Sequence, residues 1–348
     1  MPITRTCNAL LVSICFALHV PGALAATTVL KYSDHEPFGG MRTRFIEEVF
    51  FKAIEKESKG RLKIEATWDG KLATGYDALK VVGDGSKVDM ATVVPEYSAP
   101  QLPLHQLFKS YPVGPTGTRQ VAFFRQVYEK VPAFPAELAS NNVTNVLVAT
   151  GYPVAFFSNK TLGSLDDIKG EKWRYASFWH KDFLSNAGAA PVSMPWGEGI
   201  YTAIKQGDLT GLMVNVDSGY MLKVHEVAPN VLVSKDLWLG HAYLVVMNKA
   251  TWEGLAKEDR NAIQRAARTA YKTLGSVMDQ SFVAQVDDLK RSGVNIRGLS
   301  QTEVKAWEVK SNYRAVQAAW VAQQDANGLK HVAPALKAID AIMNRVMK

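Results

Sequence analysis

Arg174 is the one arginine in the stretch that runs from Leu165 to Asn215, and it stands between the aromatic residues Trp173 and Tyr175. A guanidinium presents a planar fork of donors, binds a carboxylate in two places and keeps its charge at any physiological pH. Trp196 lies in the same stretch and offers a flat surface for a ligand. The alternative roles are structural: plain core packing for Trp196, and for Arg174 an ion pair with Asp166, Asp167 or Glu171.

Other polar side chains that could contact a ligand stand at the predicted ends of strands. Polar loop residues in such places are solvated or structural in many proteins, and Asp217 has the further alternative of capping a helix. Within one cleft, however, they could bind hydroxyl or amine groups of a ligand, or act as acids and bases. The residues concerned are His35, Glu96, Tyr97, Asn215, Asp217 and His241.

Several kinds of chemistry have no matching pattern in the sequence. The histidines never occur as His-x-His or His-Glu-x-x-His, and no acidic cluster has calcium-loop spacing, so we expect no metal site. There is no Gly-x-Ser-x-Gly elbow and no glycine-rich phosphate loop, so we expect no cofactor. The Lys and Arg residues do not cluster with interleaved aromatics, which argues against a nucleic-acid partner.

Alternating strands and helices must position these groups. That order predicts an α/β fold in which the strand ends meet at a crevice. One helix, Glu258–Lys290, has apolar spacings of three and four throughout; at 1.5 Å per residue it is roughly 45 to 50 Å long and should pack along two lobes. The other predicted elements are strands Thr28–Tyr32, Leu62–Thr67, Val88–Val94, Asn145–Ala149, Phe156–Lys160, Glu171–Tyr175 with Arg174 near its end, Val231–Val233 and Tyr243–Met247, and helical segments Arg42–Ser58, Tyr76–Val82, Thr118–Tyr128, Gly199–Lys205, Gln301–Asp325 and Ala333–Val346.

The chain resembles the periplasmic solute-binding proteins of tripartite ATP-independent periplasmic (TRAP) transporters, in particular their dicarboxylate-binding, DctP-like family. In that family a Leu-Lys-Gly turn precedes a strand that ends in Arg, as Ile168-Lys169-Gly170 precedes Arg174 here. The family's Pro-x-Phe-x-Glu-x-Tyr-x-Ala-Leu-x-x-Gly is similar to Pro195–Gly207, with one residue inserted. The family's Gly-x-Val-Asp-Met strand is similar to the segment from Gly85 to Val88-Asp89-Met90, before which this chain inserts Gly83-Asp84.

The resemblance implies a role for several site residues. Arg174 would bind the ligand carboxylate, Trp196 would pack against the ligand, and His241 matches a His that precedes the family's returning strand. The family's binding Asn corresponds to Val214, one place before Asn215, and a shift of one residue turns a strand side chain to the other face. A second Arg that commonly helps the first is absent from 151–155.

The implied fold is that of periplasmic binding proteins: two α/β lobes around a ligand cleft, joined by crossing strands and the long helix. We expect lobe 1 to comprise 26–150 with 240–278 returning, and lobe 2 to comprise 151–239 with the C-terminal helices of 279–348. The implied function is capture of a small organic acid by lobe closure and its delivery to the small and large membrane subunits of the transporter. The alternative from another class is a secreted lyase or hydrolase that uses Glu96, His35 or His241 as acid or base; a third is a sensor lobe.

The first residues are typical of a cleaved secretory signal peptide. Arg5 precedes an apolar run, Ala9–Val20, and the small-residue site Ala23-Leu24-Ala25, so we expect cleavage after Ala25 and a periplasmic protein. The run is shorter than the roughly 20 residues that a membrane anchor needs. Both cysteines precede the cleavage site, which leaves no thiol. About 320 residues remain, more than one hydrophobic core usually accommodates.

Overall fold

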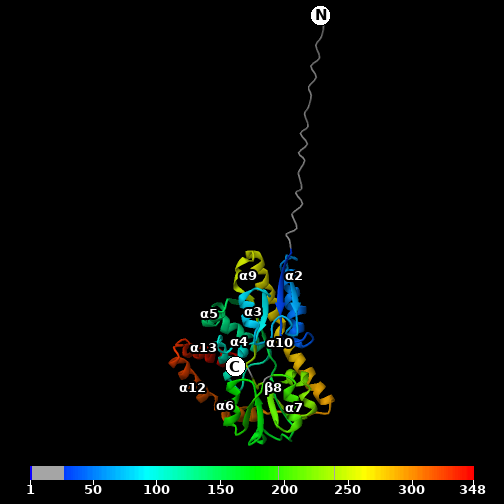
Figure 1. The fold of residues 1–348 in the computed structure, drawn as a ribbon, viewed down its shortest axis with the longest axis vertical. Coiled ribbons are helices and arrows are strands. Elements are labelled where there is room, and N and C mark those ends of the chain that lie inside the picture. Colours follow the sequence, from blue (N-terminus) through cyan, green and yellow to red (C-terminus); the bar gives the residue numbers. More distant parts are fainter. Residues whose placement is uncertain (2–26, 195, 239) are drawn as a thin grey trace.

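The computed structural model describes residues 1, 27–194, 196–238 and 240–348, and from residue 27 onward these form two lobes (Figure 1). The predicted signal peptide therefore lies, apart from Met1, outside the described residues. Within the described part of the chain, no helix has the length and apolar character that a membrane crossing would need. Each lobe is built on one sheet covered by helices, which confirms the predicted α/β class.

Lobe 1 has a five-stranded sheet in the order β2-β1-β3-β10-β4. The first three strands run parallel, so the carboxyl ends of β1 and β3 lie at one edge, and β10 is antiparallel to both β3 and β4. An antiparallel strand begins where its parallel neighbours end, so the residue before β10 reaches the same edge. The strands are β1 (Thr28–Ser33), β2 (Leu62–Thr67), β3 (Met90–Val93), β4 (Val143–Thr150) and β10 (Ala242–Asn248).

Helices cover both faces of this sheet. On one face Phe50 and Ile54 pack with Val245, and on the other Phe108 and Phe123 pack with strand residues of β3 and β10. The predicted helix Arg42–Ser58 is a continuous helical run whose central residues, Ile46–Phe51, form π-type turns between α1 and α2. The helices are α1 (Met41–Phe45), α2 (Lys52–Glu57), α3 (Ala78–Asp84), α4 (Gly117–Lys130), α5 (Ala133–Ser140) and α9 (Lys249–Gly254), with 3-10 turns at Pro95–Ser98 and Leu104–Ser110.

Lobe 2 has a six-stranded sheet in the order β11-β9-β5-β8-β6-β7. Strands β6, β7 and β8 run parallel, and β5 is antiparallel to β8 and β9. Helix α6 covers one face and helices α7 and α8 the other. The elements are β5 (Val154–Ser158), β6 (Lys172–Tyr175), β7 (Ala190–Ser193), β8 (Gly211–Asn215), β9 (Asn230–Val233), β11 (Asn295–Gly298), α6 (Phe178–Asn186), α7 (Gly199–Gln206) and α8 (Val216–Met221), with 3-10 turns at Leu165–Ile168 and Val224–Glu226.

Helix α10 (Lys257–Arg291) runs along both lobes, as its length predicts (Figure 1). Its first part, from Ile263 to Met278, belongs to a lobe 1 core, whereas Phe282 and Leu289 belong to a lobe 2 core. Where it crosses α4, Gly275 lets the two backbones touch, because a Cβ there would lie 2.4 Å from the backbone nitrogen of Thr118. The long helix therefore ties the two lobes together.

The C-terminal helices depart from two expectations. The segment Gln301–Asp325 is two helices, α11 (Gln301–Lys310) and α12 (Tyr313–Ala326), because Asn312 adopts a left-handed conformation with φ 49° that ends the helical run. Helix α13 (Val332–Val346) packs in a lobe 1 core with α4, although we assigned the whole of 279–348 to lobe 2. That assignment is wrong for α13, whose apolar face covers lobe 1.

Candidate ligand-binding site

A cavity of about 290 Å³ lies where the strand ends of the two lobes meet. Lobe 1 supplies the loops after β1 and β3 and the start of β10, and lobe 2 supplies the ends of β6 and β8 and the loop after β7. This is where open α/β sheets place ligands, since loops beyond the strands' carboxyl ends converge there. Of the site residues predicted from the sequence, the structure brings together His35, Glu96, Tyr97, Arg174, Trp196 and His241.

Arg174 comes from the end of β6 and is only 3% exposed. Its Nε donates to the carbonyl oxygen of Met194 at 3.0 Å, and its guanidinium carbon lies 5.6 Å from the centroid of the Trp196 ring. These contacts aim the remaining guanidinium nitrogens without neutralising their charge. Burial lowers the pKa of Arg174, which reflects the cost of holding this cation away from water.

The acids that could have paired with Arg174 are engaged elsewhere. Asp166 pairs with Lys169 and Lys310, and Glu171 pairs with Lys160 at 2.6 Å. Asp167 accepts from the backbone nitrogens of 163 and 164 in the turn before β6. Among the described residues, no carboxylate lies within ion-pair distance of Arg174, so the structural alternative for this residue has no support.

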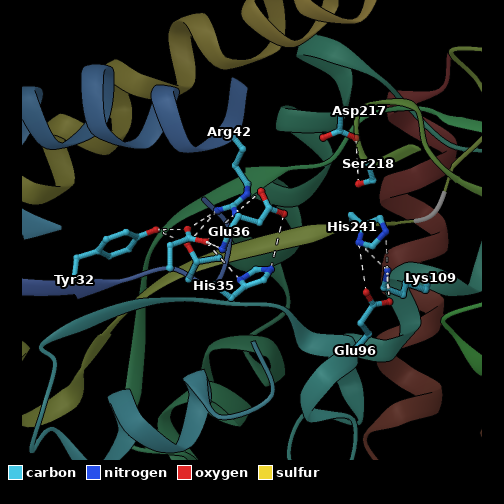
Figure 2. Close-up of polar contacts among 11 residues, drawn as sticks. Tyr32, His35, Glu36, Arg42, Glu96, Lys109, Asp217, Ser218 and His241 are labelled. Carbon is cyan, nitrogen blue, oxygen red and sulfur yellow. Dashed lines mark hydrogen bonds and ion pairs between the residues drawn. The ribbon is translucent and has the colours of Figure 1, made fainter. Parts of the chain in front are cut away.

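The other two buried cations among the described residues both have acidic partners. Lys109 Nζ lies 2.7 Å from Glu96 Oε2. Arg42 Nη1 lies 2.6 Å from Asp34 Oδ2, and its Nη2 lies 2.8 Å from Glu36 Oε2. Figure 2 shows both clusters, Arg42 with Glu36 and Lys109 with Glu96. In the described part of the chain, Arg174 is therefore the buried cation that lacks an anion.

Glu96 and His241 form a polar cluster with Lys109 (Figure 2). Burial would raise the pKa of Glu96, but the charge of Lys109 lowers it to about 2, so this carboxylate stays ionised. Burial and the adjacent Lys109 together lower the pKa of His241 to about 3, and burial lowers the pKa of His180 as well. Both imidazoles are therefore neutral at physiological pH.

Two predicted ligand residues lie outside this cavity. Val214 lines it, whereas the next residue, Asn215, is 1% exposed and packs beside Gly151. Asp217 lies in the first turn of α8 without a side-chain cap bond, and it lines a neighbouring groove of about 840 Å³ together with Glu36. Neither side chain is among those that line this cavity, and their binding of a ligand stays a prediction.

The sequence interpretation also missed residues that the structure places in or beside the cavity. Tyr243 stacks against His241, with ring centroids 5.8 Å apart. His241 directly precedes β10 and Tyr243 lies two residues further on, so the strand period could have revealed Tyr243. His180 lies inside α6 and Lys109 inside a 3-10 turn, and no spacing pattern marks either one. The remaining lining residues are Glu36, Pro37, Val94, Ala176, Met213, Val214, Ser218, Met221 and Leu222.

Comparisons with known proteins agree on one family. Residues 43–319 match the family described as bacterial extracellular solute-binding protein, family 7 (DctP). A solute-binding protein of Albidiferax ferrireducens is 25% identical over 82% of this chain and 85% of that protein. The C4-dicarboxylate-binding periplasmic protein DctP of Rhodobacter capsulatus is 24% identical over 85% of this chain and 87% of that protein. The crystal structure of a TRAP solute-binding protein from Rhodoferax ferrireducens, in complex with copurified benzoate, superimposes with a TM-score of 0.79 at 21% identity and covers 92% of this chain and 99% of that one.

Proposed function

The chain belongs to family 7 of the bacterial extracellular solute-binding proteins, and we propose that it is the periplasmic subunit of a TRAP transporter that captures a small carboxylate. The family binds solutes and does not transform them. In this function, a ligand that touches both lobes favours the closed arrangement through the contacts it makes there. The closed protein then delivers the ligand to the small and large membrane subunits.

The observation that carries this proposal is the buried, unpaired guanidinium of Arg174 in a cavity between two lobes. A buried charge without a partner costs several kcal/mol, of which a bound carboxylate recovers a part. The guanidinium fork bonds both oxygens of a carboxylate, and a ring such as that of Trp196 can pack on the body of the ligand. A small organic acid fits a cavity of about 290 Å³, which is near the lower end of small-molecule sites.

The enzyme alternative is disfavoured by the titration behaviour of its proposed acids and bases. A general acid or base works best with a pKa near the operating pH. The charge of Lys109 lowers the pKa of Glu96 to about 2, and burial with the same charge lowers the pKa of His241 to about 3. Burial lowers the pKa of His35 too. These groups suit fixed hydrogen bonding better than proton transfer.

The direct test is a binding screen of the purified chain from residue 26 onward. A thermal-shift panel of monocarboxylates, hydroxy acids, aromatic acids and dicarboxylates should give a stabilising hit, because a ligand at 100 times its dissociation constant adds about 2.7 kcal/mol. Each hit is paired with its primary amide, which keeps the shape and removes the charge. We expect calorimetric binding of the acid alone and recovery of the acid unchanged. Equal binding of the amide, or conversion of the acid, would refute the proposal.

Location and partners need separate measurements. Mass spectrometry of the exported protein should give a chain that begins at Ala26, and retention of residues before Ala23 would contradict export through a cleaved signal. With the two membrane subunits in proteoliposomes and an ion gradient, uptake of the identified acid should require this protein. Uptake at the same rate without it would contradict the transporter role.

Lobe closure can be measured by small-angle scattering. The radius of gyration should be smaller at ligand saturation than in the ligand-free protein, as lobe closure requires.

A further inference from the structure

The cavity holds a second polar group whose bonding capacity is incompletely used, the carboxylate of Glu96. Its side chain lines the cavity and is 8% exposed. Oε2 approaches Lys109 at 2.7 Å, whereas Oε1 receives no hydrogen bond from the described residues, and its contact with His241 Nδ1 is 3.9 Å long. An ionised carboxylate offers about four acceptor positions, so Glu96 can accept a hydrogen bond from a ligand.

His241 adds a donor beside this acceptor. Lys109 Nζ lies 2.9 Å from His241 Nδ1 and 3.4 Å from Nε2, and because an ammonium group only donates, we take the nearer Nδ1 as the acceptor. In a neutral imidazole the proton then resides on Nε2. Lys109 thus compensates the charge of Glu96 and also fixes the tautomer of His241.

His180 extends the polar end of the cavity toward Arg174. It is 3% exposed and lines the same cavity, and its Nε2 has no partner among the described residues. A buried polar atom without a partner is uncommon and indicates a missing group that would bond to it. The cavity therefore combines the cation of Arg174 with an ion-paired carboxylate acceptor, Glu96, and neutral imidazole groups.

We propose that the ligand is a hydroxy monocarboxylate, with its carboxylate on Arg174 and its hydroxyl between Glu96 and His241. The inference rests on the proposed function and names the ligand class of that same site. A hydroxyl both donates and accepts, so it can satisfy Glu96 and the Nε2 proton of His241 together. An ammonium group has no lone pair for His241, and it would lie beside Lys109.

A second carboxylate is the poorest fit to this end of the cavity. It would face the ionised Glu96, and like charges at short distance repel. The cations that could have offset that repulsion, Lys109 and Arg42, are already paired with Glu96 and with Asp34. The cavity is therefore selective against dicarboxylates.

The test is calorimetry of the wild-type chain with matched ligands on two carbon skeletons. The four-carbon series is butanoate, 4-hydroxybutanoate, 4-aminobutanoate and succinate, and the aromatic series is benzoate, its three hydroxy isomers and the three benzenedicarboxylates. In the series that binds, we expect one hydroxy acid to bind about 10- to 100-fold more tightly than the unsubstituted acid, the effect of one hydrogen bond to a charged group. Equal or tighter binding of the unsubstituted acid, amino acid or dicarboxylate would overturn the proposal.

Variants then locate the hydroxyl. Glu96→Gln alone leaves Lys109 without an anion, so the double variant Glu96→Gln/Lys109→Met is made beside it to remove both charges. Both should bring the ratio of the affinities for the hydroxy acid and the unsubstituted acid close to one. Glu48→Gln, the same substitution at an exposed glutamate outside the cavity that pairs with Arg44, is the matched control and should keep the preference. Loss of the preference in Glu48→Gln, or its persistence in the double variant, would overturn the assignment.

The same measurements separate this inference from the function on which it rests. If Arg174 binds a carboxylate but Glu96 does not bind a hydroxyl, all the acids bind with similar affinity and Arg174→Ala weakens all of them. If no acid in either series or in the wider panel binds, the proposed function itself fails. A preference ratio is also insensitive to a fraction of unfolded protein, because that fraction lowers both affinities equally.

Discussion

Arg42 holds Asp34 through two contacts, Nη1 to Oδ2 at 2.6 Å and Nη2 to Oδ1 at 2.9 Å. The pair is buried, and the hydroxyl of Tyr32 donates to Asp34 Oδ2 at 2.6 Å. The guanidinium also lies 4.5 Å from the ring centroid of Tyr243. This network joins the end of β1 to the start of α1, next to the cavity-lining residues His35 and Glu36 (Figure 2).

Asp34→Ala should therefore destabilise the ligand-free protein by about 3 to 5 kcal/mol, because it leaves the buried charge of Arg42 without its main partner. Urea unfolding measures this loss. Glu48→Ala is the control: it breaks an exposed pair with Arg44 at 3.3 Å and should cost less than about 1 kcal/mol. An Asp34→Ala protein as stable as this control would show that Glu36 alone compensates Arg42.

Arg174→Ala should weaken binding of the identified acid by about 30- to 5000-fold, the effect of removing one member of a desolvated charge pair. The ligand-free protein should melt no lower than wild type, because the variant removes a buried cation that no acid of the described residues compensates. Arg174→Lys keeps the charge and loses the fork, so its affinity should fall between the two. Near-normal affinity in a destabilised Arg174→Ala protein would contradict the assignment.

Asp217 should make stability fall as the pH rises from about 4 to 7. Burial, with the charge of Glu36 adding to it, raises the pKa of Asp217 to about 7, so in this window the folded state holds a proton that the unfolded state has lost. Unfolding then becomes easier as the pH increases. Buried histidines such as His241 act in the opposite direction, because burial lowers their pKa.

The measurement is the difference in unfolding free energy between wild type and Asp217→Asn at pH 5 and pH 8. Asn keeps the shape and cannot ionise, so wild type should lose stability relative to the variant at the higher pH. The histidines are common to both proteins and cancel. A difference that does not change with pH would show that Asp217 ionises normally.

The spacing of apolar residues predicted most helices and strands correctly, because each type of element buries residues at its own regular interval. Helix α10 agrees within one residue at each end, and the strand that carries Arg174 lies where its Trp-Arg-Tyr segment predicts. The lobe against which α13 packs was not predictable, since the sequence of an amphipathic helix shows which face is buried but not which element covers it. Asn312 offered a signal, because Asn tolerates left-handed backbone, but the apolar spacing continues across it.

The site was predicted less completely than the fold. His35, Glu96 and His241 lie together in the cavity. Their convergence could be predicted because each stands at an end of a strand that is recognisable in the sequence. Lys109 and His180 reach the cavity only because the chain folds back on itself, and no local pattern reveals such an approach. Asn215 shows the sensitivity to register: one residue separates a side chain that lines the cavity from one that packs behind it.

Gly151 lies in the short connection from β4 in lobe 1 to β5 in lobe 2. A Cβ at this position would lie 2.6 Å from Asn215 Nδ2 and 2.7 Å from the Cβ of His241. The backbone nitrogen of Gly151 also donates to the carbonyl oxygen of His241 at 3.2 Å. The connection between the lobes is thus packed directly against a residue of the cavity.

Gly151→Ala should lower ligand affinity by about 5- to 150-fold, because relieving an overpacked contact costs about 1 to 3 kcal/mol and displaces His241. Calorimetry with the identified acid measures the loss, and circular dichroism checks that the variant is folded. Gly254→Ala, in α9, is the matched control: its added Cβ meets no atom within 4 Å, so affinity should stay within about 2-fold of wild type. Asn215 can move only as far as the strand β8 allows, whereas the Cβ of His241 is fixed to the backbone, so the strain falls mainly on the cavity wall. Wild-type affinity in a folded Gly151→Ala protein would show that the Asn215 side chain absorbs the added methyl group alone and that the connection does not position His241.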